Sequence, residues 1–307
     1  MTDSERINNL NTPTGRVDVV LDTDAYNEVD DQYAIAYMLR SQDRLNVRAI
    51  YAAPFSNPKS GYEAGCGMEK SYNEILNILS LVGSDIPVYK GSDSFLKDEN
   101  TPVLSEASAH LVSLAKEYSC EKPLYVVAIG AITNVASAII SAPEIKDNIV
   151  VVWLGGHAHH FSDTKEFNMH QDIAAARVVM GCKAPFVQLP CMGVVSEFRL
   201  SEAEIEKWLM GHGALAEYLG SYTLKEARTY AHGRPWTRVI WDVTAVAWLL
   251  NDDGRFMRSR IEKARLPGYD GIYESTPCEH SIRYVYSINR DALMHDLISK
   301  IRSDKNV

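Results

Sequence analysis

Short apolar runs alternate along the chain with stretches in which apolar residues recur at helical spacing. A buried parallel strand is apolar on both faces, whereas a helix on a sheet needs one apolar stripe, so the pattern separates the two. Strands are expected at residues 17–22, 47–53, 87–91, 124–129, 149–154 and 184–189, and helices at 32–39, 68–81, 107–118, 133–140 and 172–180. This alternation predicts an α/β fold: an open, mainly parallel mixed sheet with helices on both faces, in a single domain.

The pattern changes after residue 190, where helical spacing dominates. Helices are expected at 202–209, 215–230, 243–250 and 292–301, and short antiparallel strands within 268–286. Residues 1–14 are polar and predict a flexible N-terminal arm, so the domain is expected to span 15–307. The chain contains no internal repeat and no linker long enough to divide two domains.

An acidic loop follows the first strand, where Asp22, Asp24, Asp30 and Asp31 fall within ten residues and Glu28 lies among them. Strand carboxyl ends form the ligand-binding edge of open α/β sheets. Crowded carboxylates repel unless a cation or proton neutralises them, and hard oxygen ligands suit calcium or magnesium better than zinc. Helix capping would explain one or two of these acids, but it leaves Asp22 and Asp24 unexplained.

The composition and charge of the chain limit the molecules it is expected to bind and the compartment in which it is expected to occur. The formal charge of −9 argues against a nucleic-acid partner, which would need a basic face. No stretch reaches the about 18 apolar residues of a membrane span, and the N-terminus does not resemble a signal peptide, so neither membrane attachment nor secretion is expected. The five cysteines are widely spaced and odd in number, as in a cytoplasmic protein with reduced thiols.

Three further stretches place polar groups where strands end or helices begin: Ala128 to Ala136 (Ala-Ile-Gly-Ala-Ile-Thr-Asn-Val-Ala), Lys165 to Met169 (Lys-Glu-Phe-Asn-Met) and Ile240 to Thr244 (Ile-Trp-Asp-Val-Thr). The first could turn a main-chain carbonyl toward a metal, and the others supply carboxylates, an amide and an aromatic ring. A packing turn, a helix cap and a capped helix start would equally account for them.

Taken together, the acidic loop, Gly-x-x-Thr-Asn, Glu-Phe-Asn and the late Asp resemble the nucleoside hydrolases of the inosine–uridine type, across roughly residues 16–250. The resemblance implies a calcium ion at the carboxyl edge of the sheet and hydrolysis of the N-glycosidic bond of small-molecule ribonucleosides, giving free base and ribose. It also implies a homo-oligomer, either a dimer or a tetramer.

The resemblance further implies roles for individual residues. Asp24 would ligate calcium and take a proton from the attacking water. The other protein ligands would be the side chains of Asp31 and Asp242 and the carbonyl of Ile129. Asp22 would lie behind the ligands and support them. The residues expected to bind ribose hydroxyls are Asp30, Glu166 and Asn168.

The chain departs from the family pattern at four places. The acidic loop is two residues longer than usual, the Asn expected after the second strand falls near Phe55, with Asn57 close by, and the Asn expected before Glu-Phe-Asn falls near His160. Trp241 occupies the position of a leaving-group histidine, as in the purine-specific branch.

Two hypotheses for the departing base follow from this last difference. Trp241, with Phe55, would stack on a purine and favour its protonation from solvent. Otherwise a histidine would supply the proton, with His232 the first candidate and His160 the second. The segment 157–160 contains three histidines in four residues, which without a cysteine is more typical of a solvated loop than of a zinc site.

Two other functions are compatible with parts of the sequence. An apolar strand followed by Asp-Thr-Asp resembles the nucleophile motif of haloacid dehalogenase-like phosphatases, although no later Lys beside an acidic pair stands out. A non-catalytic nucleoside- or calcium-binding protein would explain the departures from the family pattern. A magnesium-dependent phosphatase assay and reducing-sugar release from ribonucleosides would separate the three.

Overall fold

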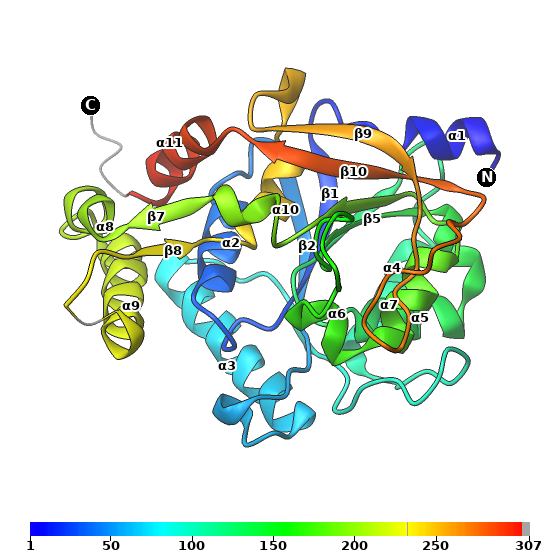
Figure 1. The fold of residues 1–307 in the computed structure, drawn as a ribbon, viewed down its shortest axis with the longest axis horizontal. Helices are drawn as coiled ribbons and strands as arrows, with labels where there is room; N and C mark the ends of the chain where they lie inside the picture. The colour runs from blue at the N-terminus through cyan, green and yellow to red at the C-terminus, as the bar shows by residue number, and fades with distance from the viewer. Residues whose placement is uncertain (232, 303–307) are drawn as a thin grey trace.

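The computed structural model describes residues 1–231 and 233–302. Its main feature is an eight-stranded sheet of order β3-β2-β1-β4-β5-β6-β10-β9, in which β9 alone is antiparallel to its neighbour (Figure 1). The strands are β1 (Val17–Thr23), β2 (Leu45–Ala52), β3 (Val88–Lys90), β4 (Leu124–Ala128), β5 (Ile149–Leu154), β6 (Phe186–Leu189), β9 (Met257–Lys263) and β10 (Ser281–Ile288). The predicted α/β fold with a mainly parallel mixed sheet is confirmed.

Successive residues of the central strands point to opposite faces of the sheet. Val19 and Leu21 belong to one core cluster, whereas Val20 between them belongs to the other, and all three are fully buried. A strand buried on both faces must be apolar at every position, which is why these runs were readable in the sequence.

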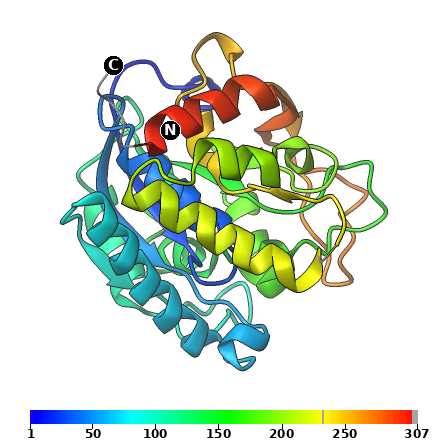
Figure 2. The same cartoon turned by 90° about the vertical axis from the view of Figure 1, so that its left-hand side faces the viewer.

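Helices cover both faces, as the two views show (Figures 1 and 2). The first cluster packs beneath α2 (Asp30–Leu39), α3 (Ala64–Val82), α8 (Glu202–Trp208), α9 (Ala214–Tyr230), α10 (Val243–Trp248) and α11 (Arg290–Ile301). The second packs beneath α4 (Glu106–Ala115), α5 (Thr133–Ser141) and α7 (Ile173–Gly181). Each predicted helix is present, with ends that differ by up to four residues.

The predicted elements need three corrections, two of them after residue 190. The antiparallel strands expected within 268–286 are instead β9 and β10, joined by a loop with an isolated bridge from Pro267 to Tyr273. A small second sheet pairs β7 (Arg199–Ser201) with β8 (Thr237–Val239), and a short helix α6 (Phe167–Gln171) follows Glu166. Strand β9 is an edge strand rich in charged residues, so its sequence contains no apolar run from which it could be predicted.

Residues 1–14, expected to form a flexible arm, contain a helix and contacts with the rest of the domain in this structure. Helix α1 (Asp3–Asn8) begins with a capping box at Thr2, and Arg6 donates a hydrogen bond of 2.9 Å to the carbonyl of Ser281. Leu10 is fully buried. A single buried apolar residue in a polar segment gives no periodic signal, which explains why the packing was missed.

We expect Leu10→Ala to lower the free energy of unfolding by about 2–4 kcal/mol, because it removes a fully buried side chain. The matched control is Ile7→Ala in the same segment, where the side chain is 37% exposed and the cost should stay below about 1 kcal/mol. Urea titration of both variants measures the difference. Equal, small effects would show that this segment is loose in solution.

Candidate active site

The strand order reverses between β1 and β4, which follow different neighbours in the chain but lie side by side in the sheet. The chain leaves β1 toward β2 on one side, and it leaves β4 toward β5 on the other. Such a switch point opens a crevice beyond the strand ends, where open α/β sheets bind ligands. A cavity of about 690 Å³ lies here, lined by residues that include Asp24 after β1 and Ile129 after β4.

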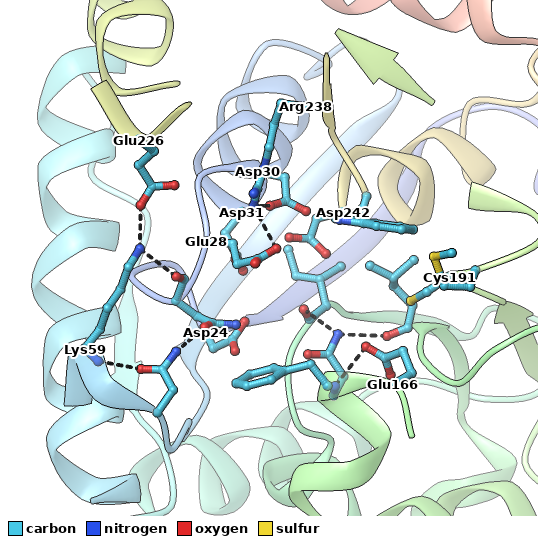
Figure 3. A pocket seen from close by; sticks show the side chains of 18 of the residues that line it. Asp24, Glu28, Asp30, Asp31, Lys59, Glu166, Cys191, Glu226, Arg238 and Asp242 are labelled. Atoms are coloured by element: carbon cyan, nitrogen blue, oxygen red, sulfur yellow. Dashed lines mark hydrogen bonds and ion pairs between the residues drawn. The ribbon is translucent and has the colours of Figure 1, made fainter. Parts of the chain in front are cut away.

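Four aspartates converge on this cavity (Figure 3). Asp24 follows β1, Asp30 and Asp31 begin α2, and Asp242 caps α10, and each is at most 4% exposed. Burial, followed by repulsion among the carboxylates, raises the pKa values of Asp24 and Asp242 well above the ordinary range, and burial with the charge of Asp30 raises that of Asp31 to about 8. The cluster therefore carries an electrostatic cost that a cation would relieve.

The immediate contacts of these carboxylates leave some oxygens without partners. The hydroxyl of Thr23 donates to Asp31 at 2.5 Å, whereas Oδ2 of Asp24 is buried without a hydrogen-bond partner among the described residues. Gly130 permits this arrangement, because a Cβ at that position would come within 3.1 Å of Cγ of Asp24. An unpaired, buried carboxylate oxygen among other acids is suited to a metal ligand.

The side chains predicted to bind the metal do not form one tight group in the described part of the chain. Within residues 1–231 and 233–302, the acidic and thiol ligand atoms that all lie within 4.8 Å of one another belong to Glu5, Cys120 and Glu121, far from the cavity in sequence and not among its lining residues. Asp24, Asp31 and Asp242 still lie close enough to repel one another, and the side chains of Asp31 and Asp242 are within hydrogen-bond reach. Their hard oxygen atoms, with the unpartnered oxygen of Asp24, nevertheless fit a calcium-like ion in chemistry.

Asp22 lies behind the cavity and does not line it. Its carboxylate accepts a hydrogen bond of 2.7 Å from the side-chain amide of Asn134, whose oxygen accepts one of 2.8 Å from the backbone of Ser92. Burial raises the pKa of Asp22 to about 7. The neighbouring Thr133 donates at 2.7 Å to Asp172, so the Thr-Asn pair of the Gly-x-x-Thr-Asn turn connects the strand ends to their surroundings.

The Glu-Phe-Asn segment reaches the cavity from the start of α6. The side-chain nitrogen of Asn168 donates to the carbonyls of Ile129 and Leu154, each at 3.0 Å. Its amide oxygen remains available to accept a hydrogen bond from a hydroxyl. Glu166 caps α6, accepting hydrogen bonds from the backbone of Asn168 and Met169. Burial raises the pKa of this carboxyl.

Charged residues that sequence reasoning missed line the opposite part of the cavity. Arg238 on β8 approaches Glu28 at 2.8 Å and Asp30 at 3.5 Å. Burial alone would lower the pKa of Arg238, but the charges of Asp30 and Glu28 outweigh it and raise the pKa. Lys59 pairs with Glu226 of α9 at 2.5 Å. Each is one residue without a motif, brought to the cavity by elements distant in sequence, so no local pattern indicated it.

Only some of the residues predicted to bind the base line the cavity. Trp241 lines the cavity, but Phe55 and His160 do not. Phe55 is fully buried where the chain leaves β2. Its backbone lies so close to Gly67 that a Cβ on residue 67 would clash with it. His160 lies against Phe161, with ring centroids 5.0 Å apart. Instead, His157 and Asn57 line the cavity, and His232 lies outside the described residues.

Comparison with known proteins agrees with this geometry. The family model "Inosine-uridine preferring nucleoside hydrolase" matches residues 19–294. A probable uridine nucleosidase 2 from Arabidopsis thaliana is 25% identical over 235 residues, covering 66% of this chain and 68% of that protein.

Solved structures show the same fold. A plant nucleoside hydrolase superposes with a TM-score of 0.73 at 19% identity, covering 95% of this chain and all of the other. A purine-preferring ribonucleoside hydrolase from Gardnerella vaginalis gives 0.73 at 21% identity, with 92% and 98% covered. Because the family match spans most of the chain, the protein belongs to the inosine-uridine preferring nucleoside hydrolase family and is a ribonucleoside N-glycosyl hydrolase.

Proposed function

We propose that this enzyme hydrolyses the N-glycosidic bond of purine ribonucleosides in a calcium-dependent reaction, releasing free base and ribose. The observation that carries the proposal is the convergence of four buried aspartates on one cavity, where Asp24, Asp31 and Asp242 have raised pKa values. Nucleoside hydrolases are generally metal-dependent, and calcium is the ion best suited to carboxylate and carbonyl oxygens in this number. Family membership sets aside the phosphatase and the non-catalytic binding protein as alternatives.

The residues that would hold the ion are Asp24, Asp31, Asp242 and the carbonyl of Ile129. That carbonyl accepts one hydrogen bond from Asn168 and keeps a second lone pair. When bound, calcium would supply positive charge that holds the ribose diol and lowers the pKa of water. Asp22 would contribute indirectly, by fixing the end of β1 through Asn134.

Asp24 is the proposed general base. Its buried, unpartnered Oδ2 is placed to accept a proton from water, and a neighbouring cation would keep the carboxylate ionised despite burial. Asp30 and the amide oxygen of Asn168 are proposed to orient ribose hydroxyls. As the base departs, positive charge develops on the sugar, and the surrounding carboxylates stabilise that charge electrostatically.

The purine preference rests on Trp241. This residue lines the cavity beside Asp242, so an indole face there could stack on a base and stabilise its departure. The relatives differ in this respect, since one is named a uridine nucleosidase and another a purine-preferring hydrolase. Phe55 plays no part in this account, because it does not reach the cavity.

A homo-oligomer, dimer or tetramer, and a cytoplasmic location remain predictions. Among the residues described, no helix combines the length and apolarity needed to cross a membrane.

The first test of the mechanism is Asp24→Asn. The amide keeps the shape of the side chain but cannot accept the water proton and binds calcium less well, so turnover should fall by at least about a hundredfold. The control is Asp85→Asn, at an exposed position outside the cavity, which should leave turnover unchanged. Release of reducing sugar from inosine measures both, and near-normal turnover by Asp24→Asn would rule out its role as base.

Metal removal should make stability depend on pH in a defined direction. The raised pKa values of Asp31, about 8, and Asp22, about 7, mean that the metal-free fold binds more protons than the unfolded chain. Its stability is therefore present at low pH and lost as pH rises through 7 to 8. We expect the melting temperature of chelator-treated protein to fall by roughly 5 °C or more between pH 5.5 and 8.5.

Added calcium should largely abolish this fall, because the ion replaces the protons that neutralise the cluster. Asp242→Asn should reduce the fall in the metal-free protein by removing one repelling carboxylate. Differential scanning fluorimetry at several pH values measures the melting temperature of the metal-free protein, of the protein with added calcium and of the Asp242→Asn variant. A metal-free protein that is more stable at pH 8.5 than at pH 5.5 would contradict the electrostatic account.

The choice between stacking and a histidine acid is tested by comparing Trp241→Ala with His232→Ala on inosine, adenosine and uridine. Stacking is worth about 1–3 kcal/mol per base, so Trp241→Ala should lose roughly ten- to a hundredfold in kcat/KM on purines and less on uridine. His232→Ala should change little. If uridine is the best substrate and His232→Ala alone is slow, the purine preference and the stacking account are both wrong.

A further inference from the structure

Strand β9 forms one edge of the main sheet, and no strand within residues 1–231 and 233–302 pairs with its outer side (Figure 1). Phe256 before the strand and Ala264 after it both hydrogen-bond through their backbone to residues that flank β10, at 2.7–3.2 Å. Because the direction of these groups alternates along an antiparallel strand, the intervening odd-numbered residues turn their N–H and C=O groups outward. Those residues are Ser259, Ile261 and Lys263.

An open edge of this kind can pair with another strand, and charged side chains commonly prevent such pairing. In β9 the charges have both signs: Arg260 and Glu262 project from one face and form an ion pair along the strand. Ile261 lies between them on the other face and is 41% exposed. Mixed charges block only the registers in which like charges meet, so the register decides whether this edge can pair.

Pairing of β9 with a second copy of itself is restricted to a few registers. Outward groups must meet outward groups, so a two-fold axis has to pass through a residue and not between two residues. Within residues 258–263, an axis at Arg258, Arg260, Glu262 or Lys263 sets that charge against itself. An axis at Ser259 sets Arg258 against Arg260. Like charges directly opposite each other destabilise a strand pair, so these registers are unfavourable.

The remaining register, with the axis at Ile261, has no such conflict. Arg260 faces Glu262 of the second copy, and by symmetry Glu262 faces the second Arg260, so four charges alternate in sign on one face. On the other face Ile261 meets its own counterpart, and Ser259 faces Lys263. The three outward residues of each copy can then form about six main-chain hydrogen bonds across the axis.

We propose that β9 is a self-association surface, at which two copies of this chain pair antiparallel about a two-fold axis at Ile261. The two eight-stranded sheets then form one continuous sheet across the interface. The partner at this edge is a second copy because the order of the charges is complementary to itself. The inference does not depend on the proposed function, since no residue of β9 lines the cavity.

The side chains that would face the second copy are already held in place. One carboxylate oxygen of Glu262 contacts Nδ1 of His159 at 3.1 Å, while the other faces Arg260. The guanidinium of Arg260 lies 5.8 Å from the ring centroid of Tyr284 and 5.4 Å from that of Tyr286. Groups ordered before association lose less conformational entropy when they associate.

A strand pair is smaller than a standard interface of about 1,600 Å², so we expect association in the micromolar range. The experiment measures molar mass by size-exclusion chromatography with light scattering, at about 1–100 μM protein. Arg260→Glu and Glu262→Arg each set like charges opposite each other, which should raise the dissociation constant at least about tenfold and yield species of half the wild-type mass. An equimolar mixture of the two variants should recover the wild-type mass, because every facing pair is then oppositely charged.

The matched control is Arg258→Glu on the same strand. In this register residue 258 faces Ala264, so the wild-type mass should be kept, whereas a register that set residue 258 against Glu262 would lose it.

Ile261→Pro tests the main-chain bonds independently of charge. It removes an outward N–H without touching the ladder to β10, so the mass should halve while the melting temperature stays near that of the wild type. Ile261→Val keeps the N–H and should keep the wild-type mass.

Three results would overturn the inference: a monomeric wild-type protein at about 100 μM, charge variants or Ile261→Pro that keep the wild-type mass, or a mixture that stays at half mass. Circular dichroism of each variant identifies misfolding, which mixing with a second variant would not repair. Failure to release base from any ribonucleoside would refute the proposed function and leave these mass measurements unaffected.

Discussion

The rest of this structure depends on holding several like charges in a crevice with little access to water. Asp24, Asp31 and Asp242 are each almost fully buried, and their pKa values are raised because ionisation there is unfavourable. A fold optimised only for stability would not gather them. Their burial is intelligible if the site stabilises positive charge, first on a bound cation and then on the ribosyl group in the transition state.

The sheet topology can hold these aspartates together despite their repulsion, because they are attached to the ends of sheet strands and helices. They follow β1 and begin α2 and α10, while Asn134 joins the end of β1 to α5 through Asp22. Asp172, which caps α7, accepts from Thr133 beside it. Repelling groups on mobile loops would move apart, whereas groups at strand and helix ends are held where the reaction needs them.

The sequence predicted those features whose signal is local. The central strands are apolar on both faces, so their positions were readable, and the acidic loop stood out because four carboxylates fall within ten residues. Residues brought in singly from distant elements had no such signal, as Arg238 and Lys59 show. Phe55 was misassigned because alignment by motif order cannot tell whether a side chain turns into the core or into the cavity.

The acidic loop after β1 also links several elements around the cavity. Glu28 and Asn27 of this loop line the cavity, where Glu28 pairs with Arg238 and Asn27 contacts both Asn57 and Lys59. These contacts join the acidic loop to β8 and to the turn after β2. Arg238 also approaches Asp30, so the positive charge that offsets part of the cluster comes from the same network. The loop therefore contributes both Asp24 and the residues that contact Lys59 and Arg238 at the cavity.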